Sequence, residues 1–273
     1  ETTGILSLFG IDFSTMDKDN LDWTKFSWDV DGTGENSVLF QTQFINDTTV
    51  TLGVPSPTPV FFGSEFQINT YTDGDQRHTF TTTQDLRAVS ALTDGGFVAV
   101  WTSFGQDGSD NGVYGQRYDA SGSALGAEFR VNTYTDGPQA EGQIAALADG
   151  SFIITWASSD QDGSDFGVFG QRYDASGSPQ GTEFEINSYT SEAQGDSSIT
   201  SLTDGGFVVT WQSFGQDGSD FGIFGQKYNA SGAPSGAEFQ INTYSDGVQM
   251  VPSVTSLSDG GFVVIWQSDG QDG

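Results

Sequence analysis

GGFVVTW, at residues 205–211, is one of four nearly identical phrases set at a constant spacing along the chain. The other copies read GGFVAVW (95–101), GSFIITW (150–156) and GGFVVIW (260–266). Each copy ends in a tryptophan, and each tryptophan follows the previous one after 55 residues. A fixed period of this length indicates one supersecondary unit that is repeated in series.

The phrase belongs to a longer unit made of short apolar segments. In order, the unit runs through SITSL (198–202), TDGG (203–206), FVVTW (207–211), QSFGQDGSD (212–220), FGIFGQKY (221–228), NASG (229–232) and EFQINTY (238–244). The apolar segments are rich in β-branched and aromatic residues and are bounded by Gly, Asp, Asn or Ser, which is typical of β-strands. The Asp-Gly pair in TDGG indicates a hairpin. No segment shows a helical period, so each unit is expected to contain about four antiparallel strands.

Four-stranded units in series are typical of the blades of a β-propeller. The predicted fold is therefore all-β, a propeller-like array of four-stranded antiparallel blades of about 55 residues. FVVTW is apolar on both faces, as expected for a strand between neighbouring blades. The recurring tryptophan is expected to fill the space between blades.

The expected organisation is a degenerate first repeat with a Pro-rich connector (1–62), followed by tandem repeats (63–273), as one propeller-like domain overall. Residues 29–47 resemble 160–176. The Glu-Phe pair of the last strand recurs after 55 residues except once, when the step is 63. The difference predicts an eight-residue insertion near 77–84.

The chain is close to five periods long, so a five-bladed ring is possible. The last copy stops after its second strand, and closure would require the N-terminal segment ILSLFGIDF (5–13) as an additional strand. The alternative is an open array that continues in a longer chain. The first residue is Glu1 and the sequence ends within a repeat phrase, which suggests an excised fragment.

The charge balance restricts the partners. Lys and Arg number 8 against 37 Asp and Glu, a formal net charge of -29. Phosphate binding requires clustered cations, so nucleic acid is excluded and anionic membrane surfaces are disfavoured. No apolar run approaches the length of a membrane span, so no membrane insertion is expected. The composition favours cations, above all Ca²⁺, which prefers carboxylate and carbonyl oxygens.

An acidic glycine-rich loop recurs as GQDGSDNG (105–112), DQDGSDFG (160–167) and GQDGSDFG (215–222). Its alternating Asp and Gly residues offer oxygen ligands on a backbone that can wrap a cation. The candidate metal ligands are Asp107, Asp110, Asp160, Asp162, Asp165, Asp217 and Asp220, together with Asp29 and Asp31 of the degenerate copy. None of the loops has the full EF-hand spacing, and Asp and Gly are also the residues that a surface turn requires.

One cationic position recurs in every complete unit, as Arg117, Arg172 and Lys227. Across the following hairpin lie Glu128, Glu183 and Glu238, so the expectation is a structural ion pair between neighbouring strands. The alternative is a contact to a sulfate or a sugar carboxylate on each blade.

Signals of catalysis are few. The single histidine, His78, lies in the insertion, and the chain has no cysteine nucleophile and no G-x-S-x-G phrase. Most acidic residues obey the repeat, whereas active sites usually break such symmetry. The expectation is that the protein is not an enzyme, although carboxylate pairs for glycoside hydrolysis are not excluded by sequence.

The phrase DGGFVVTWQSFGQDGSDFGIFGQKYNASGAPSGAEFQIN resembles the tandem repeats of very large secreted bacterial proteins of the RTX and calcium-dependent adhesin kind. The resemblance covers residues 63–273. It implies type I secretion, an extracellular or cell-surface location, calcium-rich surroundings and a role in adhesion or surface structure. The calcium nonapeptide G-G-x-G-x-D is absent, so calcium binding by a parallel β-roll is not implied.

Three functional hypotheses follow. The first is a non-catalytic extracellular repeat domain, stabilised by Ca²⁺, that serves as an adhesive or structural surface module. The second is a carbohydrate-binding propeller with a shallow aromatic site on each blade. Its candidate ligand residues are Phe104, Phe166, Phe214 and Phe221, with Asn111 replacing the aromatic residue in one copy. The third is self-association, in which the last unit of one chain is completed by a strand of the next.

Overall fold

The computed structural model describes residues 27–29, 37–39, 41–44, 50–53, 66–77 and 88–271. The chain divides into two units, Glu1–Gly63 and Ser64–Gly273. The regular elements are the strands β1 (Ser27–Asp29), β2 (Ser37–Leu39), β3 (Gln41–Phe44), β4 (Val50–Gly53), β5 (Gln76–Arg77), β6 (Val89–Ala91), β7 (Phe97–Phe104), β8 (Asn111–Tyr118), β9 (Ala124–Arg130), β10 (Gln139–Ala146), β11 (Phe152–Ser159), β12 (Phe166–Tyr173), β13 (Pro179–Glu185), β14 (Gln194–Ser201), β15 (Phe207–Phe214), β16 (Phe221–Tyr228), β17 (Phe239–Gln240), β18 (Gln249–Ser256) and β19 (Phe262–Ser268). Within these residues, no helix has the length and hydropathy needed to cross a membrane.

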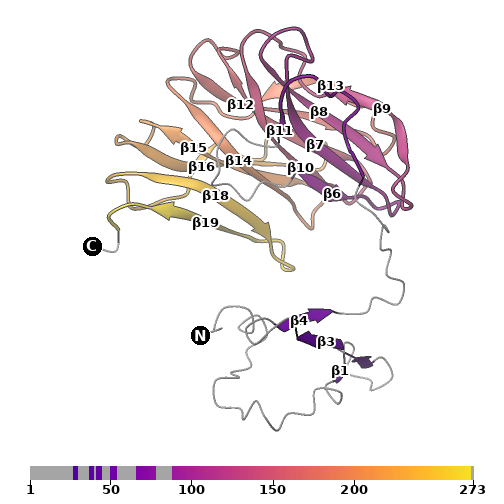
Figure 1. Ribbon diagram of the computed structural model, residues 1–273. Coiled ribbons are helices and arrows are strands. Elements are labelled where there is room, and N and C mark those ends of the chain that lie inside the picture. The colour runs from indigo at the N-terminus through magenta and orange to yellow at the C-terminus, as the bar shows by residue number, and fades with distance from the viewer. Residues whose placement is uncertain are drawn as a thin grey trace. The chain divides into compact units, whose positions relative to one another are not determined.

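In the second unit each repeat forms its own antiparallel sheet, and the strands lie in sequence order (Figure 1). Two sheets are complete, β10-β11-β12-β13 and β14-β15-β16-β17, and one is the hairpin β18-β19. The preceding sheet has five strands, because β5 and β6 both pair with β7 and are followed by β8 and β9. This arrangement confirms the prediction of an all-β, propeller-like array of four-stranded blades.

The first unit contains two small sheets among its described residues, β1-β2 and β3-β4. They belong to the segment expected to be a degenerate repeat. The N-terminal segment 5–13, proposed to close the ring, lies outside the described residues, and so does His78. Ring closure therefore stays a prediction.

Strand β11 shows why the recurring phrase is so apolar. All eight of its residues are buried, and it pairs with β12 over its whole length without a shift of register. One face of β11, with Trp156, packs against Val98 and Val113 of the preceding sheet. The other face, with Ile153, packs against the sheet that follows. Because neighbouring sheets cover both faces, the strand reads as a continuous hydrophobic run.

The predicted role is confirmed for two of the four tryptophans, Trp156 and Trp211, whereas Trp266 is half-buried. Trp156 and Trp211 are fully inaccessible, and Trp101 is almost so. Trp156 belongs to the cluster between the first two sheets, and Trp211 to the cluster between the second and third. Large aromatic rings fill the space between sheets and supply much of the apolar area that stabilises such stacking.

The first strands of successive sheets, β10, β14 and β18, lie against one another. Each carries the same irregularity two residues from its start, where the register to the second strand shifts: between Ala140 and Gln143, Gly195 and Ser198, and Met250 and Ser253. The bulged residues Glu141, Asp196 and Val251 have φ angles of 62°, 52° and 55°. A bulge bends the strand and redirects one side chain, and it is therefore where a site can form within a regular repeat.

The eight-residue insertion is located at this bulge. In the preceding sheet, β5 and β6 pair with β7 as the two halves of β10 pair with β11. Residues 78–87 stand between them, where the second sheet has only Glu141 and Gly142. The surplus of eight residues therefore enters the first strand of its sheet, near the stretch 77–84 that the spacing predicted.

Candidate functional site

Two acidic side chains of neighbouring sheets meet at the bulges. Glu141 lies on β10 and Asp196 on β14, one period apart. The Glu141 carboxyl accepts the backbone N–H of Asp196 at 3.2 Å and also hydrogen-bonds its side chain. In the fourth copy the position is Val251, whose N–H is donated to Gln212 Oε1 instead. The acidic pair therefore occurs once among the described bulges.

The environment of Glu141 favours its neutral form. Burial raises the pKa of this carboxyl, and the negative charge of Asp196 raises it further, so that the pKa reaches about 8. Two carboxyl groups in hydrogen-bond contact cannot both ionise without strong repulsion. Burial and the neighbouring charge therefore both favour the protonated Glu141 carboxyl, which can donate a hydrogen bond.

The pair lies in a cavity of about 470 Å³, called here the Glu141 pocket. Its lining residues come from three successive sheets and the loops between their strands: Asp110, Asn111, Pro138, Ala140, Glu141, Ala157, Phe166, Ala193, Gln194, Gly195, Asp196, Gln212 and Phe221. Most of the lining is apolar, with a few polar groups that converge on it. This composition and size are those of a small-molecule site.

One wall of the pocket carries an unsatisfied polar atom. Asn111 is 4% exposed, and its Nδ2 donates to Asp110 Oδ1 at 2.7 Å. Its Oδ1 is buried and has no hydrogen-bond partner in the described part of the chain. A buried acceptor without a partner is costly, and one that lines a cavity is placed to receive a hydrogen bond from a ligand.

The four candidate aromatic residues divide into two groups. Phe166 and Phe221 line the Glu141 pocket, at the register that Asn111 occupies in the first complete hairpin. Phe104 and Phe214 lie at the ends of β7 and β15 and are 46% and 38% exposed. Phe214 packs edge-on against Phe221, with ring centroids 5.2 Å apart. Two of the four aromatic candidates, Phe166 and Phe221, therefore line the pocket, and Asn111 lines it as well.

The candidate calcium loops form tight connections between the second and third strands of each sheet. Asp107, Asp162 and Asp217 each accept the N–H of the residue two positions later through Oδ1, which fixes an Asx turn. No group of three or more acidic or histidine side chains is placed to hold a metal ion in the part of the chain that the structure describes. These aspartates have a structural role as turn residues, and calcium binding stays a prediction.

The other acidic candidates are placed separately. Asp110, Asp165 and Asp220 close the loops, because their carbonyls accept the N–H of residues 105, 160 and 215. Asp160 takes the position of a loop glycine and has a φ of 60°. Asp29 belongs to β1, and Asp31 lies outside the described residues.

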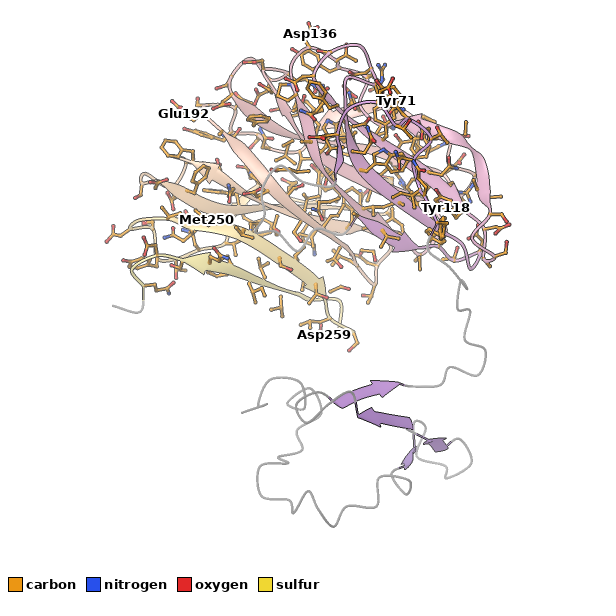
Figure 2. All side chains as sticks on the ribbon, viewed as in Figure 1. Tyr71, Tyr118, Asp136, Glu192, Met250 and Asp259 are labelled. Carbon is orange, nitrogen blue, oxygen red and sulfur yellow. The ribbon has the colours of Figure 1, made fainter. Side chains whose placement is uncertain are left out.

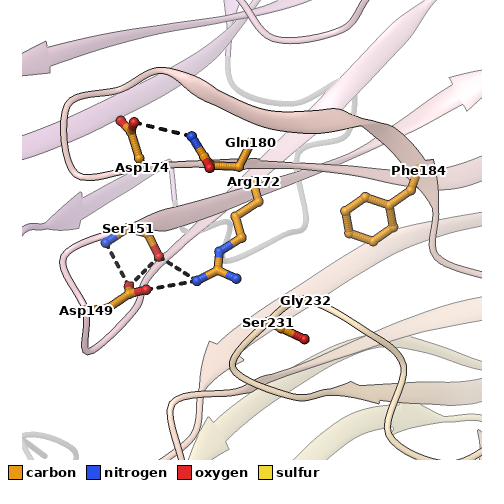
Figure 3. Close-up of a pocket in the computed structure, with 8 residues that line it drawn as sticks. All are labelled: Asp149, Ser151, Arg172, Asp174, Gln180, Phe184, Ser231 and Gly232. Atoms are coloured by element: carbon orange, nitrogen blue, oxygen red, sulfur yellow. Dashed lines mark hydrogen bonds and ion pairs between the residues drawn. The ribbon is translucent and has the colours of Figure 1, made fainter.

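The expected ion pairs across the third and fourth strands are wrong. Arg172 forms an ion pair with Asp149 at 2.9 Å, and Arg117 forms one with Asp94 at 3.2 Å. Both aspartates lie in the turn between the first and second strands of the arginine's own sheet. A second nitrogen of Arg172 donates to the carbonyl of Ala230 in the next sheet at 2.7 Å. Figure 3 shows Arg172 between Asp149 and the Ser231–Gly232 turn, in a second cavity of about 440 Å³. The arginine is long enough to cross the gap between sheets, which a strand-pair interpretation of the sequence overlooks.

The glutamates bind backbone instead of cations. Glu183 accepts the N–H of Thr133 at 2.6 Å and the side chain of Gln161 at 2.7 Å. Glu128 and Glu238 bind Thr70 and Ser188 in the same way. Glu183 and Glu238 therefore join their sheets to the segment that leads away from the preceding sheet, and Glu128 binds the segment before β5. The recurring arginines and glutamates thus make separate contacts and do not pair with each other.

Sequence reasoning missed Glu141 and Asp196, and it named Asn111 only as the residue that replaces the aromatic candidate in one copy. The signal was present in the aligned copies: QAEGQIAAL (139–147), QGDSSITSL (194–202) and QMVPSVTSL (249–257) differ in their third column, which is Glu, Asp and Val. An acidic residue in two adjacent copies of one column breaks the repeat symmetry. Without the bulge, however, nothing in the sequence places the two carboxyl groups in contact.

No family model matches the chain, and no curated protein matches it. Among solved structures it is similar to an alpha-L-arabinanase from Penicillium chrysogenum complexed with arabinobiose (14% identity, TM-score 0.47), over 67% of this chain and 58% of that one. It is also similar to an endo-arabinase from Bacteroides thetaiotaomicron (13%, TM-score 0.41, over 71% and 76%) and to an alpha-L-arabinofuranosidase from Lactobacillus brevis (11%, TM-score 0.41, over 65% and 63%). The chain spans less than two thirds of the length of the arabinofuranosidase. At such low identity the likeness concerns the fold alone.

These comparisons correct two expectations, that the chain is a non-catalytic adhesive or structural module and that it is not an enzyme. The similar structures named above are enzymes by their titles. The expectation of no enzymatic activity depended on the lack of a histidine or cysteine constellation. Glycoside chemistry needs neither, because paired carboxyl groups suffice. The lining of the Glu141 pocket contains three carboxyl side chains, those of Asp110, Glu141 and Asp196.

Proposed function

We propose that this domain binds a neutral saccharide in the Glu141 pocket. The observation that carries the proposal is the convergence of an acidic pair and an unsatisfied amide oxygen on a cavity whose lining surface is mostly apolar. Carboxyl oxygens and the Asn111 Oδ1 accept hydrogen bonds from hydroxyl groups, which a sugar offers on several sides. The rings of Phe166 and Phe221 supply the flat apolar walls that such a ligand requires.

The charge of the site argues for a neutral, hydroxyl-rich ligand over an anion. The pocket lining contains Asp110, Glu141 and Asp196 and no cationic side chain. A phosphate or a carboxylate ligand would be repelled by these groups and by a net charge of -29. Transfer of a sugar hydroxyl from water into the pocket costs little free energy, because hydrogen-bond acceptors are already in place there.

A second candidate function is acid-assisted cleavage of a glycosidic bond. It is favoured by Glu141, whose raised pKa keeps a proton available near neutral pH in a pocket that contains further carboxyl groups. A general acid for glycoside hydrolysis needs such a raised pKa, and a second carboxylate has to act as base or nucleophile. Asp110 is the carboxylate of the lining that is not hydrogen-bonded to Glu141.

The test is a screen of the whole chain on a glycan array, followed by titration of the best sugar and measurement of reducing ends. Asn111→Phe is the main variant, because phenylalanine already stands at this register in the next two sheets. It removes the unsatisfied acceptor and is expected to weaken binding about tenfold. Gln180→Ala, in the other cavity, is the matched control and should bind like the wild type.

Glu141→Gln separates the two candidates. Glutamine keeps the shape and the hydrogen bonds but has no titratable proton, so it should retain sugar binding and abolish any release of reducing ends. No binding on a broad array would contradict the proposed function. Binding that Asn111→Phe leaves unchanged would place the sugar elsewhere.

A further inference from the structure

The lining of the Glu141 pocket contains the same positions of the repeat twice. In five cases, two residues that lie 55 positions apart in the sequence both line the cavity. These pairs are Pro138 and Ala193, Ala140 and Gly195, Glu141 and Asp196, Ala157 and Gln212, and Phe166 and Phe221. The cavity is therefore built from two successive copies of one arrangement.

The two copies form two halves of the cavity, each at a junction between sheets. Strand β8 of the first sheet lies against β10 of the second, and β12 of the second lies against β14 of the third. The first half is called here the Asn111 half, and its lining residues are Asp110, Asn111, Pro138, Ala140, Glu141 and Ala157. The second is called the Phe166 half, and its lining residues are Phe166, Ala193, Gln194, Gly195, Asp196 and Gln212.

Each half offers the groups that one sugar ring requires. Its bulge carries a carboxyl side chain, on Glu141 in one half and on Asp196 in the other, and these two residues share a left-handed backbone with φ angles of 62° and 52°. Across the junction stands the first residue of a third strand, which is Asn111 or Phe166. One half thus combines an acidic group with an amide, and the other combines an acidic group with an aromatic ring.

The two halves are open to each other. They belong to one cavity of about 470 Å³, and the Glu141 carboxyl reaches across to accept the N–H of Asp196 at 3.2 Å. Stacked sheets lie about 10 Å apart, which is more than the width of one sugar ring. A single sugar residue therefore occupies one half, whereas a chain of two or three residues extends through both.

The arrangement does not continue at the next junction. The bulge residue there is Val251, which has no hydrogen-bonding side chain and whose N–H is donated to Gln212 Oε1. Val251 is not among the residues that line the cavity. Among the described bulges, only those of Glu141 and Asp196 therefore provide the paired halves.

We propose that the Glu141 pocket binds a saccharide chain that occupies the Asn111 half and the Phe166 half at the same time. This assignment rests on the proposed function, since the ligand is the neutral saccharide of the same pocket and only its length is new. When one residue of the chain is bound, another is held close to the other half, so that its binding costs less entropy than the binding of a separate sugar. Affinity should therefore rise with chain length.

The test compares neutral sugars of one and three residues on the full chain. The probes are glucose with cellotriose and maltotriose, xylose with xylotriose, and mannose with mannotriose. Calorimetry measures the affinity of the three-residue probes, and ligand-observed NMR measures that of the single sugars. In the series that binds, the three-residue probe should bind at least about tenfold more tightly than the single sugar. Equal affinities would overturn the proposal.

Reciprocal substitutions test whether both halves are used. Asn111→Phe places in the first sheet the residue that the next two sheets hold at this position, and Phe166→Asn makes the opposite exchange. Because both residues already occur at this position of the repeat, the fold is expected to accept them. Each variant should weaken binding of the three-residue probe about tenfold, and at most one of them should weaken binding of the single sugar. Gln180→Ala, in the other cavity, is the control and should bind both probes like the wild type.

The outcomes distinguish the length of the ligand from sugar binding itself. A variant that leaves binding of the three-residue probe unchanged would show that its half is not occupied. Loss of single-sugar binding in both variants would show that one ring contacts both walls. Either result would overturn the occupation of two halves while sugar binding stands. Failure of every probe to bind the wild type would instead contradict the proposed function, and the length assignment with it.

Discussion

At the scale of single residues, the position of Glu141 explains its chemistry. The same column of the repeat holds Asp196 and Val251, and all three adopt a left-handed backbone at a bulge. Such a conformation costs about 1 kcal/mol for a non-glycine residue and points the side chain out of the regular alternation. In this sheet the redirected carboxyl reaches the neighbouring bulge, where burial and Asp196 together favour its protonated form.

The first prediction concerns the pH dependence of stability. Because the pKa of Glu141 is raised to about 8, the folded chain binds this proton more tightly than the unfolded chain does. The resulting stabilisation is complete below the ordinary glutamate pKa of about 4.3 and is lost as the pH rises through about 8. Glu141→Gln imitates the neutral acid at every pH. It should melt like the wild type near pH 4 and be more stable above pH 8, by on the order of 1 kcal/mol after allowance for solvent screening.

Melting curves between pH 4 and pH 9 provide the measurement. Glu192→Gln, an exposed change that removes the same charge near the start of β14, is the control and should follow the wild-type profile (Figure 2). Parallel profiles of wild type and Glu141→Gln would show that the carboxyl titrates normally.

At the scale of elements, a buried asparagine forms hydrogen bonds to both its own sheet and the next one. Asn187 follows β13, and its Oδ1 accepts the N–H of Val168 at 2.7 Å, while its Nδ2 donates to the carbonyl of Tyr189 at 3.1 Å. The same side chain reaches Gln194, the first residue of β14, at 3.4 Å. Asn132 and Asn242 repeat the arrangement. The outer strand of one sheet and the inner strand of the next are thereby held in a fixed relation.

The second prediction follows from this contact. Asn187→Ala leaves the buried N–H of Val168 without its acceptor and opens a small cavity, and should lower the free energy of unfolding by about 2–3 kcal/mol. Chemical denaturation measures the change. Gln180→Ala, at an exposed position of β13, should cost less than about 0.5 kcal/mol. Equal effects of the two substitutions would show that the asparagine contributes no more than a surface residue.

At the scale of the whole molecule, the dominant feature is the excess of 37 acidic over 8 basic residues. Among the described residues, two arginines form ion pairs, and each of these arginines also hydrogen-bonds the next sheet. The remaining carboxylates repel one another and oppose the compact state. Screening by salt should therefore stabilise the fold.

The third prediction is that the melting temperature rises by several degrees between low salt and about 0.15 M NaCl, where the Debye length is about 8 Å. Calcium binding, expected from the acidic loops, predicts a larger rise in millimolar Ca²⁺ than in NaCl of matched ionic strength, reversed by chelator. Differential scanning calorimetry distinguishes the two effects. Identical melting temperatures in the two salts would leave screening as the whole explanation.

The sequence by itself determined the repeat, its four strands and their order, because period and alternation are local properties of the chain. It also located the insertion, through the unequal spacing of Glu128 and the preceding Glu-Phe pair. Only the tertiary structure decided which side chains meet. The bulge that joins Glu141 to Asp196, and the crossing of Arg172 to the next sheet, depend on contacts between residues about one period apart. A linear pattern carries no information on such distances, since they arise from how the sheets stack.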